Sequence, residues 1–451
     1  MNYTRPIRKR ENSCWRSATA VAACVLLAGC AGLPGPGVTE AAISERAERL
    51  TTLTAASGHD VTSVARNGLL LSPSVREAAS LVSASADEVR VQRAALFPGL
   101  RLSAYGGVGS SGSADPSIEL TGSQLLFDGD DSQRAVSMAD FNLQISYIAF
   151  QKAVDDAVLE VLKTYDDVQM QSELFEVYKN QLAALRELRS LVAARATSGA
   201  APSTDVLEAR KRTQSAAFLV NDTELALAEA RDRLILLSGQ SQGGHVRIFP
   251  ATCAARGETD SVRTARLELS RAQVALARAE NALTPRVFLK PVVGGKLSFN
   301  EFPIGINIDI QSDLLQGGAL TAKANAARNN LAAAEANLEV VSLEDDLAGR
   351  GLLRSLTAGD RKTDMLERQI DLLSETRALY RNQYFDMGTR QISELLDNEE
   401  EYYGRQAELV ELRAELAADR LDCAVRNRVL RRELELESNS IYGYPLASKS
   451  I

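Results

Sequence analysis

The chain of 451 residues contains only two histidines, His59 and His245, and 5% aromatic residues. Because most protein metal centres and most general acid–base sites use histidine, this scarcity disfavours both kinds of site. Past residue 40, no run approaches the ~20 consecutive apolar residues that a membrane-spanning helix requires. A formal net charge of −8 excludes the basic surface of a typical nucleic-acid-binding protein. We therefore expect no resident cofactor, no nucleic-acid partner and no enzymatic role, since a His, Cys or Ser constellation is also missing.

The N-terminus has the layout of a secretory signal. Residues 1–16 carry five basic side chains against one acid, and a short apolar run from residue 18 to 27 follows. The run ends in Leu-Ala-Gly-Cys at residues 27–30, which resembles the lipobox of bacterial lipoproteins and predicts a covalent lipid on Cys30. Residue 31 is Ala, whereas an Asp there is the usual inner-membrane retention mark of that family, so the resemblance favours the outer membrane. The alternative is an ordinary signal sequence with an incidental cysteine.

Beyond the signal sequence, the mature chain keeps Cys30, Cys253 and Cys423. If Cys30 is acylated, the other two can form a disulfide or remain separate thiols in an oxidising compartment. Glycines and prolines between residues 32 and 37 predict a flexible tether to the lipid.

The chain repeats itself, and its length already suggests two units or an elongated molecule. Four separated segments recur at an almost constant offset of 187 to 189 residues: 74–78 with 261–265, 95–98 with 282–285, 125–126 with 314–315, and 199–208 with 388–397. This spacing indicates an internal duplication. We predict the boundaries 1–29 (signal peptide), 30–71 (lipid tether and N-terminal helical segment), 72–250 (first repeat), 251–437 (second repeat) and 438–451 (tail).

Each repeat contains a long helical hairpin. Residues 130–198 lack Gly and Pro, and a helix of that length would measure ~100 Å. Every seventh residue from Val154 to Leu182 is apolar, which places one continuous seam on the helix. Gly199 and Pro202 predict a tight turn before a return helix over 204–238.

The second repeat has the same plan over 319–387, with a turn at Gly388 and a return helix from about 391 to 437. Three glycines, Gly349, Gly351 and Gly359, depart from the first repeat and predict a kink or break. They lie ~45 to 60 Å from the turn, at the height of the loop 239–258 and of Cys423, so a disulfide to Cys253 is sterically conceivable.

Between the helices the hydrophobic period changes to two residues. Alternation over 304–310, 100–105, 118–120 and 287–290 predicts four strands, one hairpin in each repeat, with Pro291 at an edge or a bend. Long helices separate the two hairpins, so we expect each to lack further partners in the chain. Four strands cannot close in a membrane, whereas three chains supply twelve, which predicts a homotrimer.

The remaining motifs are weaker indicators of function. The G-x-G-x-x-G at residues 107–112 precedes a strand rather than a helix, so it is a hairpin loop. Residues Glu399–Glu401 and the two histidines are expected on the surface. The acid pairs Asp205/Glu208 and Glu394/Asp397 each lie on one helix face just past a turn. In a three-fold assembly they would form cation-favouring rings of carboxylates, or they act on the helix dipole, and both roles can coexist.

Together these features resemble the TolC-like outer-membrane channel family, also called outer-membrane efflux proteins, over residues 72–437. The segments that carry the resemblance are 125–129 (Leu-Leu-Phe-Asp-Gly), 314–318 (Leu-Leu-Gln-Gly-Gly) and the turn 388–397. The resemblance implies a mainly α fold with long antiparallel hairpins and four strands per chain, which form a trimeric twelve-strand β-barrel. In that family, acids at the positions of Glu394 and Asp397 ring the closed periplasmic entrance, and a basic residue at Arg390 helps to latch it. Gln316 stands where the first repeat has an acid, Asp128.

The resemblance further implies a passive export duct of a tripartite efflux pump or a type I secretion system. Its partners would be the outer-membrane lipid, a periplasmic adaptor protein and an inner-membrane pump of the RND or ABC type. Many pump-associated members are lipoproteins, in agreement with Cys30. Two other classes fit parts of the sequence: a periplasmic adaptor lipoprotein with a coiled-coil hairpin, and a lipid-anchored periplasmic enzyme. Drugs, metal ions and polypeptides are all compatible with such a duct as cargo.

Overall fold

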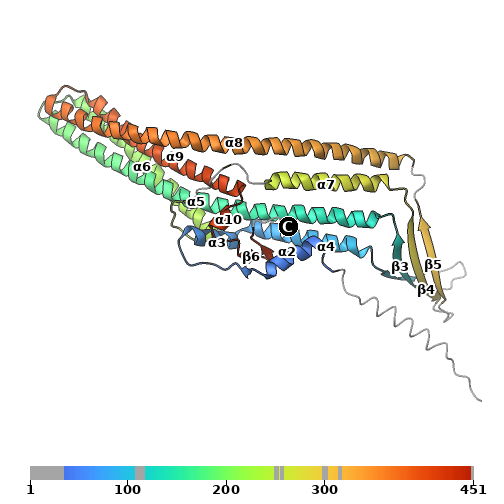
Figure 1. The fold of residues 1–451 in the computed structure, drawn as a ribbon. Helices are drawn as coiled ribbons and strands as arrows, with labels where there is room; N and C mark the ends of the chain where they lie inside the picture. The colour runs from blue at the N-terminus through green and yellow to red at the C-terminus, as the bar shows by residue number, and fades with distance from the viewer. Residues whose placement is uncertain are drawn as a thin grey trace, which may run out of the picture. The chain divides into compact units, whose positions relative to one another are not determined.

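A computed structural model describes residues 35–106, 117–247, 253, 258–296, 303–312 and 317–447. The chain divides into two compact units, each assembled from separate stretches (Figure 1). Unit 1 comprises Met1–Ala41, Ser83–Gln144 and Leu267–Glu335, and unit 2 comprises Ala42–Val82, Ile145–Arg266 and Ala336–Ile451. Both predicted repeats therefore contribute to both units. Among the described residues, none of the helices combines the length and the apolar composition needed to cross a membrane.

Unit 1 contains a four-stranded antiparallel sheet. Its strands are β2 (Gly99–Tyr105), β3 (Ser117–Phe127), β4 (Arg286–Lys296) and β5 (Ile304–Gln311), in the spatial order β2-β3-β4-β5. The four predicted strands are confirmed, but the expectation that the two hairpins lack further partners is wrong, because β3 pairs with β4. Pairing satisfies backbone groups that two separate hairpins would leave open along these edges.

The strand register aligns apolar side chains in a row across the sheet. One row, Leu102–Leu120–Val293–Ile304, crosses all four strands, since each residue is the Cα partner of the next. Of the two positions expected for Pro291, an edge or a bend, the edge is wrong: β4 is a central strand, and Pro291 pairs with Ile306. On the neighbouring strand β3, Gly122 leaves room for the Pro291 ring, since a Cβ added at Gly122 would lie 2.7 Å from Pro291 Cγ.

Parts of several helices, together with ion pairs, complete unit 1. The helix α2 (Val38–Glu48) precedes α4 (Pro73–Ala94), and α7 (Asp260–Glu280) leads into β4. Thr39 Oγ1 donates a 2.7 Å hydrogen bond to Asp140, and Arg90 pairs with Glu40. Arg278 Nε lies 2.6 Å from Asp131, which fixes the end of α7 against the start of the first long helix.

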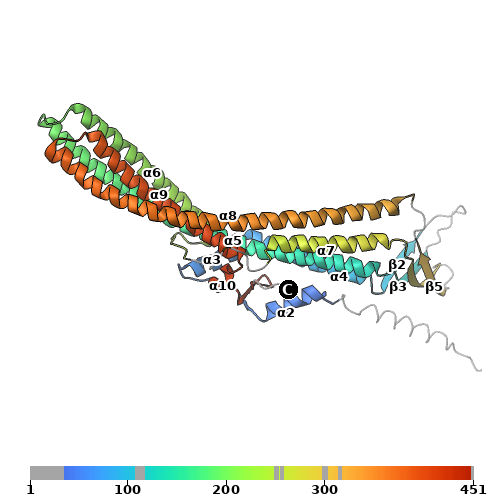
Figure 2. The same ribbon diagram turned by 45° about the horizontal axis from the view of Figure 1, so that its top comes forward.

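Unit 2 contains the greater part of two helical hairpins, which lie side by side in Figures 1 and 2. The first consists of α5 (Asp131–Thr197) and α6 (Ser203–Ser238). The second consists of α8 (Ala319–Asn382), which ends in a single π-helical turn, η1 (Gln383–Met387), and α9 (Ile392–Arg426). Gly199 and Gly388 have φ angles of +76° and +66°, the left-handed conformation that favours glycine at a helix end. Both predicted hairpins and both turns are confirmed.

Of the kink or break predicted in the second long helix, the break is wrong, because α8 is continuous through its three glycines. Two of them allow α9 to approach closely. A Cβ on Gly359 would lie 2.3 Å from Leu416 Cδ2, and one on Gly349 would lie 3.0 Å from Arg426 Nε. Gly351 has open space around its Cα, so it lacks such a role.

The last helix is shorter than predicted: α9 ends at Arg426 rather than near residue 437. Arg428 adopts a positive φ of 55°, and the short helix α10 (Leu430–Glu433) follows. This break places Arg431, whose side chain is 2% exposed, against Asp155 at 2.6 Å. A buried ion pair and its hydrogen bonds thus stop a helix that local propensity alone would extend.

Two further connections hold the middle of unit 2. Strand β1 (Thr51–Thr52) pairs in parallel with β6 (Asn439–Ile441), which pairs with β7 (Tyr444–Pro445), and α3 (Val61–Leu71) follows β1. Cys253 and Cys423 form a disulfide, with their Cα atoms 4.9 Å apart. Of the two alternatives left open by the sequence, the structure therefore has the bridged one.

Candidate aperture at the hairpin turns

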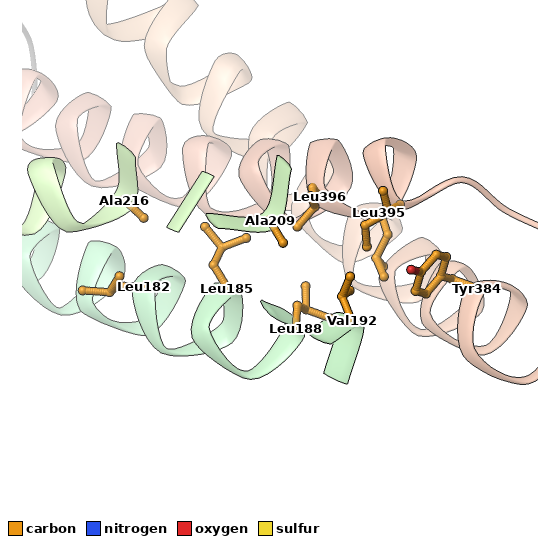
Figure 3. Packing of buried hydrophobic residues seen from close by; sticks show 10 residues of the cluster. Leu182, Leu185, Leu188, Val192, Ala209, Ala216, Tyr384, Leu395 and Leu396 are labelled. Carbon is orange, nitrogen blue, oxygen red and sulfur yellow. The ribbon is translucent and has the colours of Figure 1, made fainter. Parts of the chain in front are cut away.

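The turns of both hairpins are held together by one apolar cluster in unit 2. Its buried members come from the ends of α5 and α8 and the beginnings of α6 and α9: Leu182, Leu185, Leu188, Val192, Ala209, Ala216, Tyr384, Ile392, Leu395 and Leu396 (Figure 3). A Cβ added at Gly199 or Gly388 would meet no other atom within 4 Å. The two turns therefore lie on a shared core, and the acidic residues just past them lie close enough to interact.

One acid from each predicted pair, Glu208 and Asp397, binds a residue that sequence reasoning missed. Arg212 of α6 lies 2.9 Å from Glu208 and 2.8 Å from Asp397 of α9, and it also pairs with Glu400. The hydrogen bond from Arg212 holds the pKa of the Glu208 carboxyl below its ordinary value. The Glu208–Arg212 spacing of four residues is a signal that the sequence offered, whereas the link to α9 depends on the fold.

Arg390 and Glu394 form an ion pair within the second turn, 3.1 Å apart. The Arg390 guanidinium also lies 3.9 Å from the centre of the Tyr380 ring and donates to Gln383 at 3.0 Å. Glu394 accepts from the backbone N–H of Gln391 at 3.4 Å and completes a capping box for α9. Glu394 thus has the helix-terminal role that was one of its two predicted roles.

Asp205 lies at the other turn and accepts a 3.2 Å hydrogen bond from the Tyr384 hydroxyl of η1. Burial, followed by the nearby Asp205 charge, raises the pKa of Tyr384 to about 12. Arg195, at the end of α5, donates to the carbonyl oxygens of Tyr384 and Phe385 at 2.6 and 2.8 Å. A cation at the end of a helix satisfies carbonyls that lack a partner there. Neither Arg195 nor Tyr384 was predicted from the sequence.

The surface position expected for residues Glu399–Glu401 is wrong for the first of them. The Glu399 side chain is 1% exposed and pairs with Arg377 of α8 at 2.6 Å, which ties the two helices of the second hairpin together.

His245 is half exposed and pairs with Glu173 at 2.8 Å. Within the described part of the chain, no cluster of His, Cys, Asp and Glu side chains fits a metal ion. The turns thus combine ion pairs with a buried apolar cluster.

Three predictions lie outside the described residues. These are the signal peptide at residues 1–29, the lipidation of Cys30 and the hairpin loop at residues 107–112. Residues 314–316 of the second border segment lie outside them as well.

Comparison with known proteins places these elements in a known fold. Residues 64–240 match the family model described as outer membrane efflux protein. The outer membrane protein VceC of Vibrio cholerae shares 17% identity with this chain, over 86% of this chain and 96% of VceC, with a TM-score of 0.73. The CmeC outer membrane channel of Campylobacter jejuni shares 12%, over 87% and 88%, with a TM-score of 0.72. The MtrE channel of Neisseria gonorrhoeae, in its open state, shares 18%, over 82% and 89%, with a TM-score of 0.67. Among curated protein sequences there is no match.

The solved structures show the TolC-like fold of this chain, with its long hairpins and four antiparallel strands. The match to the model described as outer membrane efflux protein covers less than half of the chain, and the solved structures, at 12% to 18% identity, show its fold. The predicted fold class, mainly helical with long antiparallel hairpins and four strands, is confirmed.

Proposed function

We propose that three copies of this chain assemble into a passive export duct, with a twelve-strand barrel in the outer membrane and a helical tunnel that ends at the hairpin turns. The observation that carries the proposal is the sheet of unit 1. Within the described residues, β2 and β5 each pair with one neighbour, so the sheet has two open edges. Unpaired edge amides cost several kcal/mol each in lipid, and a closed ring of strands removes them.

The two faces of the sheet support a lipid environment. The four isoleucines of β5, at positions 304, 306, 308 and 310, are between 63% and 71% exposed. The opposite face carries the ion pair between Lys290 and Asp309. An apolar outer face and a polar inner face are the pattern of strands that line an aqueous channel through a membrane.

The long helices carry a second unpartnered apolar surface. The helix α8 exposes Met365, Leu372 and Leu379 at intervals of seven residues, each more than 60% exposed. The helix α6 exposes Leu207, Phe218 and Leu225. Seven-residue spacing suits packing against another helix, and neighbouring copies of the chain would supply it.

The turns would form the periplasmic aperture, with Asp205, Glu208, Glu394 and Asp397 facing the constriction and Arg390 as a latch. Rings of acids at a constriction favour cations and repel anions. Opening would require the hairpins at Gly199 and Gly388 to move, driven by contacts that favour the open state. The similar MtrE channel was solved in an open state, which supports an aperture that can open in this fold.

The proposal also includes a membrane anchor and partner proteins. A lipid on Cys30 would anchor the chain to the outer membrane, and a periplasmic adaptor with an inner-membrane RND or ABC pump would deliver the cargo. The alternative role of adaptor is disfavoured, because an adaptor would have one hairpin followed by small β-domains. Here two hairpins share one core, and their strand pairs form one sheet.

Membrane fractionation and gel electrophoresis of unheated and heated samples test the assembly. We expect the chain in the outer-membrane fraction, with an unheated band at three times the monomer mass and a heated band at 48.7 kDa or slightly less after signal removal. Cys30→Ser should remove metabolic labelling by palmitate without abolishing the trimer. A detergent-free, monomeric, water-soluble protein would contradict the proposal.

A further inference from the structure

Arg212 is shared between the two hairpins of one chain in an unusual way. Its Nε lies 2.9 Å from Glu208 of α6, its Nη2 lies 2.8 Å from Asp397 of α9, and its Nη1 pairs with Glu400 of α9. Each nitrogen of one guanidinium thus binds a different carboxylate. The Arg212 side chain is only 24% exposed, so water screens these contacts less than it would at an open surface.

The charges in this group do not balance. Three carboxylates surround Arg212, and the next cation, Lys211, lies 3.8 Å from Glu208 with its side chain 71% exposed. The Glu208 hydrogen bond raises the pKa of Arg212, and the same bond lowers the pKa of Glu208. Both groups therefore stay ionised throughout the physiological pH range.

We propose that Arg212 is a specificity-determining residue of the aperture, which compensates carboxylates of both hairpins and so limits the cation preference that those acids give the channel. The inference rests on the proposed function, because the acids set permeability only if ions pass the turns. It assigns a different task to Arg390, which pairs with Glu394 inside the second turn. Arg212 joins α6 to α9, so the two hairpins of one chain share a single compensated group.

Planar-bilayer recordings of the purified trimer test this assignment. Arg212→Gln removes the positive charge that compensates three carboxylates in each chain. The reversal potential in a KCl gradient should therefore move toward the equilibrium potential of K⁺. Arg212→Lys keeps a point charge and should restore most of the wild-type value. The matched control is Arg231→Gln, an exposed position on the same helix, which should leave the reversal potential unchanged.

Two further measurements separate charge from folding. Arg212→Gln combined with Asp397→Asn removes one uncompensated carboxylate and should reverse part of the shift. In 1 M KCl the Debye length is about 3 Å, against about 10 Å at 0.1 M, so the shift should shrink with salt. Intact trimers on unheated gels confirm that each variant is folded.

The outcomes distinguish the two proposals. If folded Arg212→Gln trimers keep the wild-type reversal potential while Glu394→Ala with Asp397→Ala changes it, the aperture stands and the role of Arg212 is wrong. If no variant at the turns changes the permeability of a conducting trimer, the aperture itself is misplaced. A shift with Arg212→Gln that Arg212→Lys fails to restore would also overturn the charge-based role.

Discussion

Cys253, in the segment that connects α6 to α7, is bonded to Cys423 of α9, a residue 170 positions further along the chain. The Cys253 and Cys423 side chains are 3% and 0% exposed. The bond therefore fixes the connecting segment to the last long helix from inside the protein, and it closes a large loop of the unfolded chain.

Loss of this disulfide should destabilise unit 2. We expect Cys253→Ser to lower the free energy of unfolding by about 2–4 kcal/mol, because the unfolded chain regains loop entropy. Urea unfolding followed by circular dichroism measures the change. The double variant Cys253→Ser/Cys423→Ser should match the single variant and lose its response to reductant. Equal stability of wild type and double variant would show that the bond has no such role.

The buried pair of Arg431 and Asp155 allows a test with an adjacent control. Arg431→Met leaves the Asp155 carboxylate, which is 5% exposed, without its cation, and should cost about 3–5 kcal/mol. Arg432→Met should change stability by less than about 0.5 kcal/mol, because its side chain is 64% exposed. Adding Asp155→Leu to Arg431→Met should recover stability. A similar cost for both arginine variants would contradict the assignment.

The glycines of α8 should respond to alanine in opposite directions. Gly359→Ala places a Cβ against Leu416, a buried member of the cluster with Leu366, Leu409 and Leu412, and should cost about 1–3 kcal/mol through overpacking. Gly351→Ala meets open space and should gain up to about 1 kcal/mol from helix propensity. Thermal unfolding compares the two. Equal effects would show that close approach of α9 does not explain Gly359.

The exposed acids of the second turn should influence ion permeation. Glu394→Ala with Asp397→Ala removes two negative charges per chain, so anion conductance should rise and block by polycations should weaken. Single-channel recordings in planar bilayers measure both. The control Glu335→Ala with Glu339→Ala makes the same charge change on exposed positions of α8, far along the helix from the turn. Unchanged selectivity in the first variant would remove these acids from the gate.

Several elements were predicted to within one or two residues. The sequence without Gly or Pro over 130–198 became α5, Asp131–Thr197, and the glycines at 199 and 388 became left-handed turns. The alternating isoleucines became β5. These features depend on local chemistry: helix length follows from the lack of breakers, and strand faces follow from a two-residue period.

Other features were missed because they depend on contacts between distant segments. The helix α9 ends at Arg426 because Arg431 pairs with the buried Asp155 of α5. The helix α8 stays unbroken where its Gly359 packs against Leu416 of α9. Glu399, in a run of three acids, is buried because Arg377 lies opposite it. Local sequence patterns do not predict which distant residues pair with one another.

The sequence by itself determined the repeat, the two helical hairpins with their glycine turns, and the four strands, because these follow from periodicity and from residues that break helices. Only the tertiary structure decided that β3 joins β4, that Cys253 meets Cys423, and that one arginine, Arg212, binds acids of both hairpins. Each of these three contacts joins segments far apart along the chain, where the free energy of burial and charge pairing, rather than local propensity, selects the partner.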